Sequence, residues 1–417
     1  MNSYKDKFNN SIKNTLFKKL SNDEQEFIKQ KAYDLKFSHQ EIKQIVDMAR
    51  DLVMWNEKNI IEIFPDHKQK KVVFTRLRKA YQEIKNTPNT YKDFILANNP
   101  QEQKYSFNKE EKDGFGLGLC PVASEKTRCC NLLTLDAVES CGFDCSYCSI
   151  QSFYNQNKIT FDSGFADKLK NLKLDKNKTY HIGTGQSSDS LMWGNREGVL
   201  DALFEFAREY PNVILEFKTK SDNIKYLLEN DVPKNIFCTW SLNPQVIVEN
   251  EEQLTASLDK RLASARAVAN KGVKVGFHFH PIVEYEGYLD DYNKVYQRVL
   301  NEFKSDEVAL ISFGTLTFIK PVIKKLRERN FKSKITQMPF EDAGGKSSYP
   351  LEIKREMFKH AYNSFRAWHD KDVFFYMCME DQSLWKEVFG YEYATNNDFE
   401  KAMLHAYSKK IGLEYLI

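Results

Sequence analysis

The chain has 417 residues and a mass of 48.8 kDa, and 41% of the residues are hydrophobic, 13% aromatic and 29% charged. This is the composition of a folded soluble chain, and it excludes collagen-like, coiled-coil and wholly disordered proteins. The net charge of +3 argues against a strongly basic nucleic-acid coat. No run approaches the roughly 20 apolar residues that span a bilayer, and the first residues lack the apolar core of a signal peptide. We therefore expect a cytoplasmic protein with no membrane partner.

Residues 1–110 are predicted to form a helical N-terminal region. Ser21 is followed by Glu24 and Ser38 by Glu41, and each pair has the spacing of a capping box that opens an apolar-periodic helix. Such a pair of helices is compatible with a helix-turn-helix DNA reader, but two packed helices are more often plain scaffold, which we favour. The region holds 21 Lys and Arg against 15 Asp and Glu, so it is the basic part of the chain.

From residue 131 to about 330, short β-branched runs alternate with helical segments. The strand candidates are NLLTLDAV, TYHIGTG, VILEFKT, NIFCTWSL, VKVGFHFHPI and VALISFGTL. Strict alternation implies right-handed crossovers and a parallel sheet, and six such units fit a partial barrel or a doubly wound sheet. In both folds the site lies at the carboxyl ends of the strands. We assign this α/β domain to residues 111–330, and we assign a C-terminal α/β extension with the strand VFFYMCM to residues 331–417.

Six of the eight cysteines lie between residues 120 and 148. A disulfide framework is not expected in a cytosolic chain, so this crowding indicates metal or redox chemistry. Cys141, Cys145 and Cys148 form a Cys-x3-Cys-x2-Cys loop after the first predicted strand. A structural zinc site closes with four protein ligands, whereas a [4Fe-4S] cluster held by three cysteines leaves one iron open. The alternative is a zinc knuckle that takes its fourth ligand from Cys120, Cys129 or Cys130.

The cysteine loop, its position and the alternation that follows resemble the radical SAM superfamily. Residues 131 to about 316 resemble its spore photoproduct lyase branch, in FKTKSDNIKYLL, WSLNPQVI, LDKRLASARAVANKGVKVGFHFHPI and the EGY at 286–288. The resemblance implies a partial (β/α)6 TIM-type barrel with a [4Fe-4S] cluster on Cys141, Cys145 and Cys148. It also implies S-adenosylmethionine (SAM) as the ligand of the fourth iron, and an electron donor such as flavodoxin or ferredoxin.

The resemblance also implies a set of SAM-contacting residues. Lys220 and Ser241, at the ends of the third and fourth strands, match the lysine and serine that hold the methionine moiety of SAM. An ammonium can pair with the SAM carboxylate, and a hydroxyl can donate or accept beside it. The further matches are the aromatic Tyr147 in the loop, Gly183 and Gly185 of GTG, Ser188 and Asp189 of SSD, and His280 at the end of the fifth strand.

Two departures from the lyase pattern concern the end of the reaction. Gln186 lies in the stretch that matches SAM-contacting residues, but it stands where the lyase has a cysteine that donates hydrogen. Ser149 stands where the lyase has a relay tyrosine. Neither side chain gives up a hydrogen atom readily, so the resemblance names no catalytic residue here. The basic, aromatic segment that the lyase inserts at its lesion is shortened to QMPFEDAGGKSSYP.

The leading hypothesis is therefore a radical SAM enzyme of the photoproduct-lyase-like group, acting on damaged DNA or a nucleotide with a changed termination step. A second hypothesis keeps the cluster and SAM but takes a small molecule or a protein side chain as substrate. A third hypothesis is a metal-containing nucleic-acid-binding protein without catalysis. Lys220 and Ser241 argue against this third hypothesis, because a binding module needs no SAM cradle.

Overall fold

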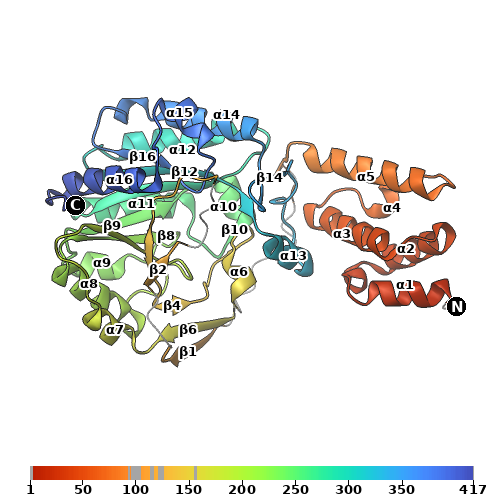
Figure 1. Ribbon diagram of the computed structural model, residues 1–417, viewed down its shortest axis with the longest axis horizontal. Coiled ribbons are helices and arrows are strands. Elements are labelled where there is room, and N and C mark those ends of the chain that lie inside the picture. The colour runs from red at the N-terminus through yellow and green to blue at the C-terminus, as the bar shows by residue number, and fades with distance from the viewer. Residues whose placement is uncertain are drawn as a thin grey trace.

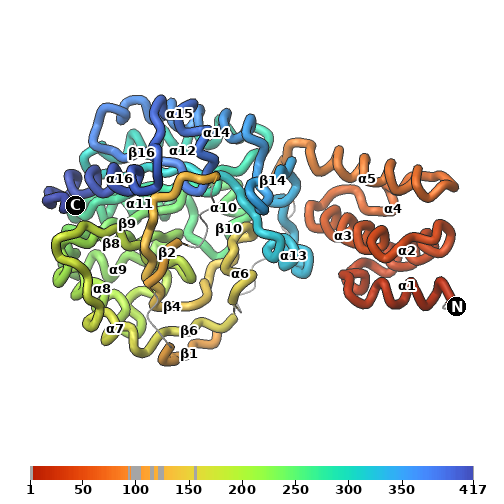
Figure 2. The backbone as a smooth tube through the Cα atoms, viewed as in Figure 1, coloured from red at the N-terminus to blue at the C-terminus, as the bar shows by residue number. Residues whose placement is uncertain are grey.

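The computed structural model describes residues 3–92, 94, 105–112, 117–120, 126–154 and 157–416. A curled α/β barrel forms one end of the molecule, and a separate bundle of helices stands beside it (Figure 1). The two chain ends lie at opposite ends of the long axis (Figure 2). No helix among the described residues is long and apolar enough to cross a membrane.

The N-terminal bundle consists of α1 (Tyr4–Ile12), α2 (Asn22–Leu35), α3 (His39–Trp55), α4 (Ile60–Ile63) and α5 (Lys70–Asn86), with a short 3-10 turn at Phe17–Lys19. Both predicted capping boxes are present, at Ser21 before α2 and at Ser38 before α3. Each serine accepts a hydrogen bond from the backbone of the glutamate three residues on, which bonds back in turn. The helices therefore begin where the sequence predicts.

The central sheet has eight strands in the order β16-β12-β11-β9-β8-β7-β3-β2. Their bounds are β2 (Leu117–Leu119), β3 (Leu133–Leu135), β7 (Tyr180–Thr184), β8 (Val213–Thr219), β9 (Ile236–Ser241), β11 (Lys274–Ile282), β12 (Val308–Thr315) and β16 (Phe374–Met377). All neighbours pair in parallel except β2, which is antiparallel to β3. The six predicted strands and the partial-barrel fold are confirmed, while the antiparallel edge strand β2 was not anticipated.

Helices follow the strands as a barrel requires. They are α7 (Phe165–Asn171), α8 (Val199–Glu209), α9 (Lys225–Glu229), α10 (Gln245–Glu251), α11 (Leu258–Asn270), α12 (Tyr288–Glu302), α13 (Lys320–Glu328), α14 (Leu351–Ser364), α15 (Ser383–Phe389) and α16 (Asn396–Ile411), with 3-10 turns at Arg196–Gly198 and Arg366–Trp368. Their inner faces bury aliphatic and aromatic residues against the sheet. Burial of this apolar surface is the main force that closes the barrel.

Three small sheets complete the fold. One joins β1 (Ser106–Glu110), β6 (Lys158–Asp162) and β4 (Val138–Glu139), a second pairs β5 (Asp144–Cys145) with β10 (Glu252–Gln253), and a third joins β13 (Thr317–Phe318), β15 (Ser347–Ser348) and β14 (Glu341–Asp342). A four-residue helix, α6 (Ile150–Phe153), follows β5. The proposed division at residues 110 and 330 stays a prediction.

Buried polar contacts attach the N-terminal bundle to α13 and the segment after it. The Arg327 guanidinium donates two 2.7 Å hydrogen bonds to the carboxylate of Asp51 in α3. The Trp55 indole donates to Thr336 Oγ1 at 2.9 Å, and Ser333 N donates to the carbonyl of Met54 at 3.0 Å. A bidentate arginine-carboxylate pair and a buried indole bond each constrain orientation, so α3 is held in a defined position beside the barrel.

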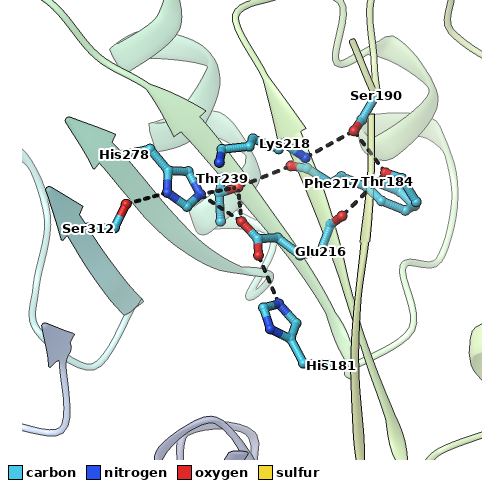
Figure 3. Close-up of polar contacts among 9 residues, drawn as sticks. All are labelled: His181, Thr184, Ser190, Glu216, Phe217, Lys218, Thr239, His278 and Ser312. Carbon is cyan, nitrogen blue, oxygen red and sulfur yellow. Dashed lines mark hydrogen bonds and ion pairs between the residues drawn. The ribbon is translucent and has the colours of Figure 1, made fainter. Parts of the chain in front are cut away.

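A layer of polar side chains crosses the barrel interior (Figure 3). Glu216 of β8 accepts hydrogen bonds from His181 Nε2 at 2.8 Å, His278 Nε2 at 2.7 Å and Thr239 Oγ1 at 2.7 Å. His278 Nδ1 lies 2.5 Å from Ser312 Oγ. Burial raises the pKa of Glu216, but the two imidazoles outweigh this effect and lower it well below its ordinary value. Burial and the charge of Lys218 lower the pKa of His278 to about 4, so this ring is neutral.

The pKa of His278 predicts a pH-dependent stability. Between pH 6.5 and about 4 the unfolded chain protonates this histidine and the folded chain does not, so the free energy of unfolding falls as the pH falls. The slope from this group is about 1.4 kcal/mol per pH unit. We expect urea denaturation at several pH values to show this slope in the unmodified protein and a shallower one in His278→Asn. Exposed His39 provides the control, since His39→Asn should leave the slope unchanged, and equal slopes in all three proteins would contradict the assignment.

Candidate active site

A cavity of about 720 Å³ opens at the carboxyl ends of the parallel strands. The structure brings eleven of the twelve predicted site residues to its wall, namely Cys141, Cys145, Tyr147, Cys148, Gly185, Gln186, Ser188, Asp189, Lys220, Ser241 and His280. The twelfth, Gly183, lies inside β7, where a Cβ atom would stand 3.2 Å from the Leu132 side chain. Gly183 therefore allows close packing of Leu132 and does not line the cavity.

The cysteine loop packs tightly against neighbouring side chains. A Cβ atom on Gly142 would come within 2.4 Å of Met192 and 2.7 Å of Trp193, so this position requires glycine. The Met192 sulfur lies 3.9 Å from Cys141 Sγ, and the Tyr105 hydroxyl donates to the Gly142 carbonyl. These contacts hold the loop against the segment that follows β7.

Burial raises the pKa of all three loop thiols, and the Lys220 ammonium opposes this at Cys145 and Cys148. Across the described residues, no three His, Cys, Asp or Glu side chains converge on a point that a single metal ion could occupy. A tetrahedral zinc site needs all its ligands around one ion. In a cuboidal cluster each thiolate binds a different iron, so the sulfurs stand further apart.

Two adjacent buried carboxylates hold the back of the loop. Glu251 accepts hydrogen bonds from Ser146 Oγ at 2.5 Å, Ser333 Oγ at 2.6 Å, Tyr91 OH at 2.8 Å and Lys334 N at 2.9 Å. One carboxylate thus contacts the cysteine loop, the chain after the N-terminal bundle and the segment after α13. Burial raises the pKa of Glu251, and these donors satisfy its oxygens.

Glu252 is the second carboxylate. It accepts a hydrogen bond from the Tyr147 hydroxyl, another from Asn243 Nδ2 at 2.8 Å, and forms a 2.6 Å ion pair with Arg261. Both Glu252 and Arg261 are fully buried. Burial raises the pKa of Glu252, but Arg261 and Lys220 together outweigh this effect and lower it below its ordinary value. The ion pair of Glu252 and Arg261 is therefore charged.

The SSD segment positions Lys220. Asp189 accepts hydrogen bonds from Lys220 N and Thr219 Oγ1, each at 2.7 Å, and from the backbone of Leu191 and Met192. The Asp189 carboxylate is therefore engaged in hydrogen bonds with other groups of the protein. Ser188 Oγ accepts a 3.2 Å bond from the Trp193 indole. The Lys220 ammonium lies 5.7 Å from the centre of the Tyr147 ring, on the side of the cysteine loop.

Ser241 and His280 lie on the next strands. The Ser241 carbonyl accepts a 2.9 Å bond from Arg261, which links this strand end to Glu252. Burial and the neighbouring Lys218 lower the pKa of His280 well below its ordinary value, so a neutral imidazole lines the cavity.

Sequence reasoning missed several residues that line or support the cavity. Lys218, Thr315, Thr317, Lys346 and Met379 also line the cavity. Lys218 has a sequence signal, since it precedes Lys220 by two residues at the end of β8, and residues two apart along an extended chain point to the same side. Glu251, Glu252 and Arg261 carried no distinguishing signal, because charged residues are most often solvated.

A second hollow of about 640 Å³ adjoins the cavity and shares Phe153 and Tyr154 with it. Its other lining residues include Lys19, Lys325 and Arg329. Phe153 is 67% exposed, which is unusual for a large aromatic side chain. Arg329 is paired with Asp144, and the half-exposed Lys325 lies 3.8 Å from the carboxylate of Glu328, which also lines the hollow. The cavity mouth therefore combines an exposed ring with basic side chains.

The family comparison matches residues 65–347 to "Spore photoproduct lyase". Among curated proteins, spore photoproduct lyase of Geobacillus sp. (strain Y412MC61) is 24% identical over 47% of this chain and 59% of its own length. That of Clostridium acetobutylicum is 22% identical over 58% of this chain and 76% of its own length. The match thus spans less than two thirds of the Geobacillus protein.

Solved structures agree in fold. A spore photoproduct lyase complexed with dinucleoside spore photoproduct superimposes with a TM-score of 0.54 at 20% identity, covering 65% of this chain and 82% of the other. A mutant of that enzyme with bound AdoMet and dinucleoside spore photoproduct gives 0.52 at 19% identity, covering 65% and 81%. Since the family match extends over 283 of 417 residues and the barrel is shared, this chain belongs to the spore photoproduct lyase family.

Proposed function

We propose that this protein is a radical SAM enzyme that acts on a nucleic-acid lesion and ends the reaction differently from spore photoproduct lyase. The observation that carries the proposal is the shared cavity, because Cys141, Cys145, Cys148, Lys220 and Ser241 reach it from three separate parts of the chain. When bound, the cluster and SAM would supply one-electron cleavage of the sulfonium and a carbon radical that abstracts hydrogen.

The loop fits a cluster that lacks a fourth protein ligand. Cys141, Cys145 and Cys148 would bind three irons, and Glu251 and Glu252 would keep the loop in place through Ser146 and Tyr147. Three thiolates are soft ligands suited to iron–sulfur binding. The charge of Lys220 favours their deprotonated form at Cys145 and Cys148.

The cavity wall fits SAM beside that loop. Lys220 would pair with the SAM carboxylate, Ser241 and Ser188 would contribute hydroxyls, and Gly185, Gln186 and His280 would face the ligand. Asp189 would act through Lys220, because its hydrogen bond from Lys220 N positions the lysine. The neutral ring of His280 would add no positive charge to the cavity that would hold the SAM sulfonium.

The surroundings of the cavity support a nucleic-acid substrate. The two lyase structures named above bind a dinucleoside spore photoproduct. In this chain, exposed Phe153 offers a surface for base stacking, and Lys19 and Lys325 beside it offer positive charge to phosphates. A carrier such as flavodoxin or ferredoxin would supply electrons.

The departures at the two relay positions support a changed ending. Gln186 and Ser149 both line the cavity, so the amide and hydroxyl stand beside the place where the substrate radical would be quenched. Neither donates a hydrogen atom as a thiol does.

The cluster assignment predicts the behaviour of single cysteine variants. After anaerobic reconstitution with iron and sulfide, the unmodified protein should show an iron–sulfur absorption spectrum that changes on adding SAM. Cys141→Ala, Cys145→Ala and Cys148→Ala should each abolish that SAM response, because two thiolates are too few for the cluster. Cys238→Ala, buried within β9, is the control and should keep it. Purification with stoichiometric zinc and no iron uptake would contradict the assignment.

The SAM cradle predicts a loss of affinity without loss of the cluster. Lys220→Ala and Ser241→Ala should weaken SAM binding by about 1.5 to 3 kcal/mol in equilibrium titrations, the lysine variant more because its bond to a carboxylate is charge-assisted. Lys225→Ala, an exposed lysine of α9, is the matched control and should bind SAM as the unmodified protein does. Unchanged affinity in both cradle variants would mean that SAM lies elsewhere.

The relay departures predict poor turnover of dinucleoside spore photoproduct. The unmodified protein should form 5′-deoxyadenosine with this substrate yet repair it slowly or not at all, with thymine products trapped by small reductants. Gln186→Cys combined with Ser149→Tyr should increase clean repair, measured by chromatography. If the unmodified protein repairs the lesion cleanly and catalytically, a different residue donates the hydrogen.

A further inference from the structure

Two lysines at the end of β8 line the cavity, Lys218 and Lys220. Lys220 lies beside the cysteine loop, with its ammonium 5.7 Å from the centre of the Tyr147 ring, and it is the lysine that would pair with the SAM carboxylate. Lys218 lies two residues further into the strand. The cavity wall therefore holds a second ammonium for which the SAM cradle gives no role.

The backbone of Lys218 is fixed on both sides by Ser190. Lys218 N donates to Ser190 Oγ at 3.0 Å, and Ser190 N donates to the Lys218 carbonyl at 3.2 Å. Ser190 directly follows Asp189, which accepts the bond from Lys220 N. Two successive residues after β7 thus position the two lysines separately. In Figure 3 the side chain of Lys218 leads away from Ser190.

The ammonium of Lys218 lacks an anionic partner in the part of the chain that the structure describes, where it enters no ion pair and no side-chain hydrogen bond. Glu216, two residues earlier on the strand, is engaged by two histidines and a threonine. The carboxylates of Asp136 and Asp189, which line the cavity, accept bonds from nearby backbone amides. A half-buried charge that loses water without gaining a partner is costly, so a bound anion would compensate it.

The neighbouring wall of the cavity supplies no negative charge either. The ring of His280 packs over Gly314, where a Cβ atom would come within 2.8 Å of the ring and 3.1 Å of the Cys378 carbonyl. Burial, followed by the charge of Lys218, lowers the pKa of both His278 and His280, so both imidazoles are neutral. Burial raises the pKa of the Cys378 thiol to about 12, although Lys218 opposes this, and the thiol is neutral as well.

We propose that Lys218 binds a phosphate group of the substrate inside the cavity, separately from the SAM cradle. The inference rests on the proposed function, in which the substrate is a nucleic-acid lesion. A lysine ammonium is a common point-charge partner of phosphate. Lys346, on the turn before β15, also lines the cavity and adds a second positive charge to it. The phosphate that joins the two nucleosides of a lesion fits best, because it lies next to the reacting bases.

Binding of two forms of one lesion tests the assignment. The cluster-loaded protein with SAM is titrated anaerobically with dinucleoside spore photoproduct and with the corresponding dinucleotide, which carries the linking phosphate. We expect the unmodified protein to bind the dinucleotide about tenfold more tightly. Lys218→Met should bind both forms equally, whereas Lys218→Arg should keep the preference because it keeps the charge. The matched control is Lys225→Met, at an exposed lysine of α9, which should also keep it.

A preference for the dinucleotide that survives in Lys218→Met overturns the inference and leaves the proposed function intact. If that variant instead loses SAM affinity with the preference unchanged, the lysine serves SAM. If it loses only stability, the lysine balances the charge of Glu216. Equal binding of the two forms by the unmodified protein also overturns the inference.

A second measurement needs no lesion. In the SAM-loaded protein, thymidine 5′-phosphate should protect Lys218 from acetylation by acetic anhydride, whereas thymidine should not, and peptide mass mapping should show Lys225 acetylated in every sample. Equal acetylation of Lys218 with both probes overturns the inference. Protection by the phosphate in a protein that binds neither form of the lesion would instead overturn the proposed function alone.

Discussion

The arrangement of the cavity depends on the buried carboxylates of Glu251 and Glu252. These neighbours stand behind the cysteine loop and bond to Ser146 and Tyr147, so successive residues of the loop are fixed from one point. Glu252 is charged and compensated by Arg261, and a buried ion pair of this kind specifies geometry more than it adds stability. The loop has further supports in Met192, Tyr105 and the pairing of β5 with β10, but the contacts of Ser146 and Tyr147 come from these two carboxylates.

The same carboxylates connect the loop to distant parts of the chain. Glu251 bonds to Tyr91 and to Ser333 and Lys334, and these segments flank the N-terminal bundle and the end of α13. The bundle is itself held by Arg327 and Trp55. Phe153 and Lys325 at the mouth of the cavity therefore lie on elements that are joined to the cysteine loop.

Much of this architecture was predictable because its signals are local. Capping boxes at Ser21 and Ser38 and the alternation of strands and helices depend on neighbours in sequence, and they were correct. Eleven of twelve site residues reached the cavity because parallel strands end at one edge of a sheet. Gly183 is not among the residues that line the cavity, and sequence alone does not tell which neighbour a glycine accommodates, here Leu132.

What could not be predicted depends on contacts between remote segments. The Glu251 and Glu252 anchors need partners more than a hundred residues away, and the edge strand β2 is too short to show a period. The bridge between Thr127 and Asp381 joins segments at the two ends of the sheet, so it needs the barrel to form first. Sequence spacing groups Cys120 and Cys130 with the loop, whereas the fold places Cys120 after the edge strand β2 and Cys130 on a segment that bridges to Asp381, beyond β16.

The interior layer around Glu216 has a consequence for how this barrel can evolve. Glu216, His278, Thr239 and Ser312 each have a partner there that would be left buried and unsatisfied if one residue changed alone. Neutral drift at Glu216, His278, Thr239 or Ser312 must therefore proceed through paired replacements. Related chains should carry either this whole set or an apolar substitute for it, and mixtures of the two should be rare.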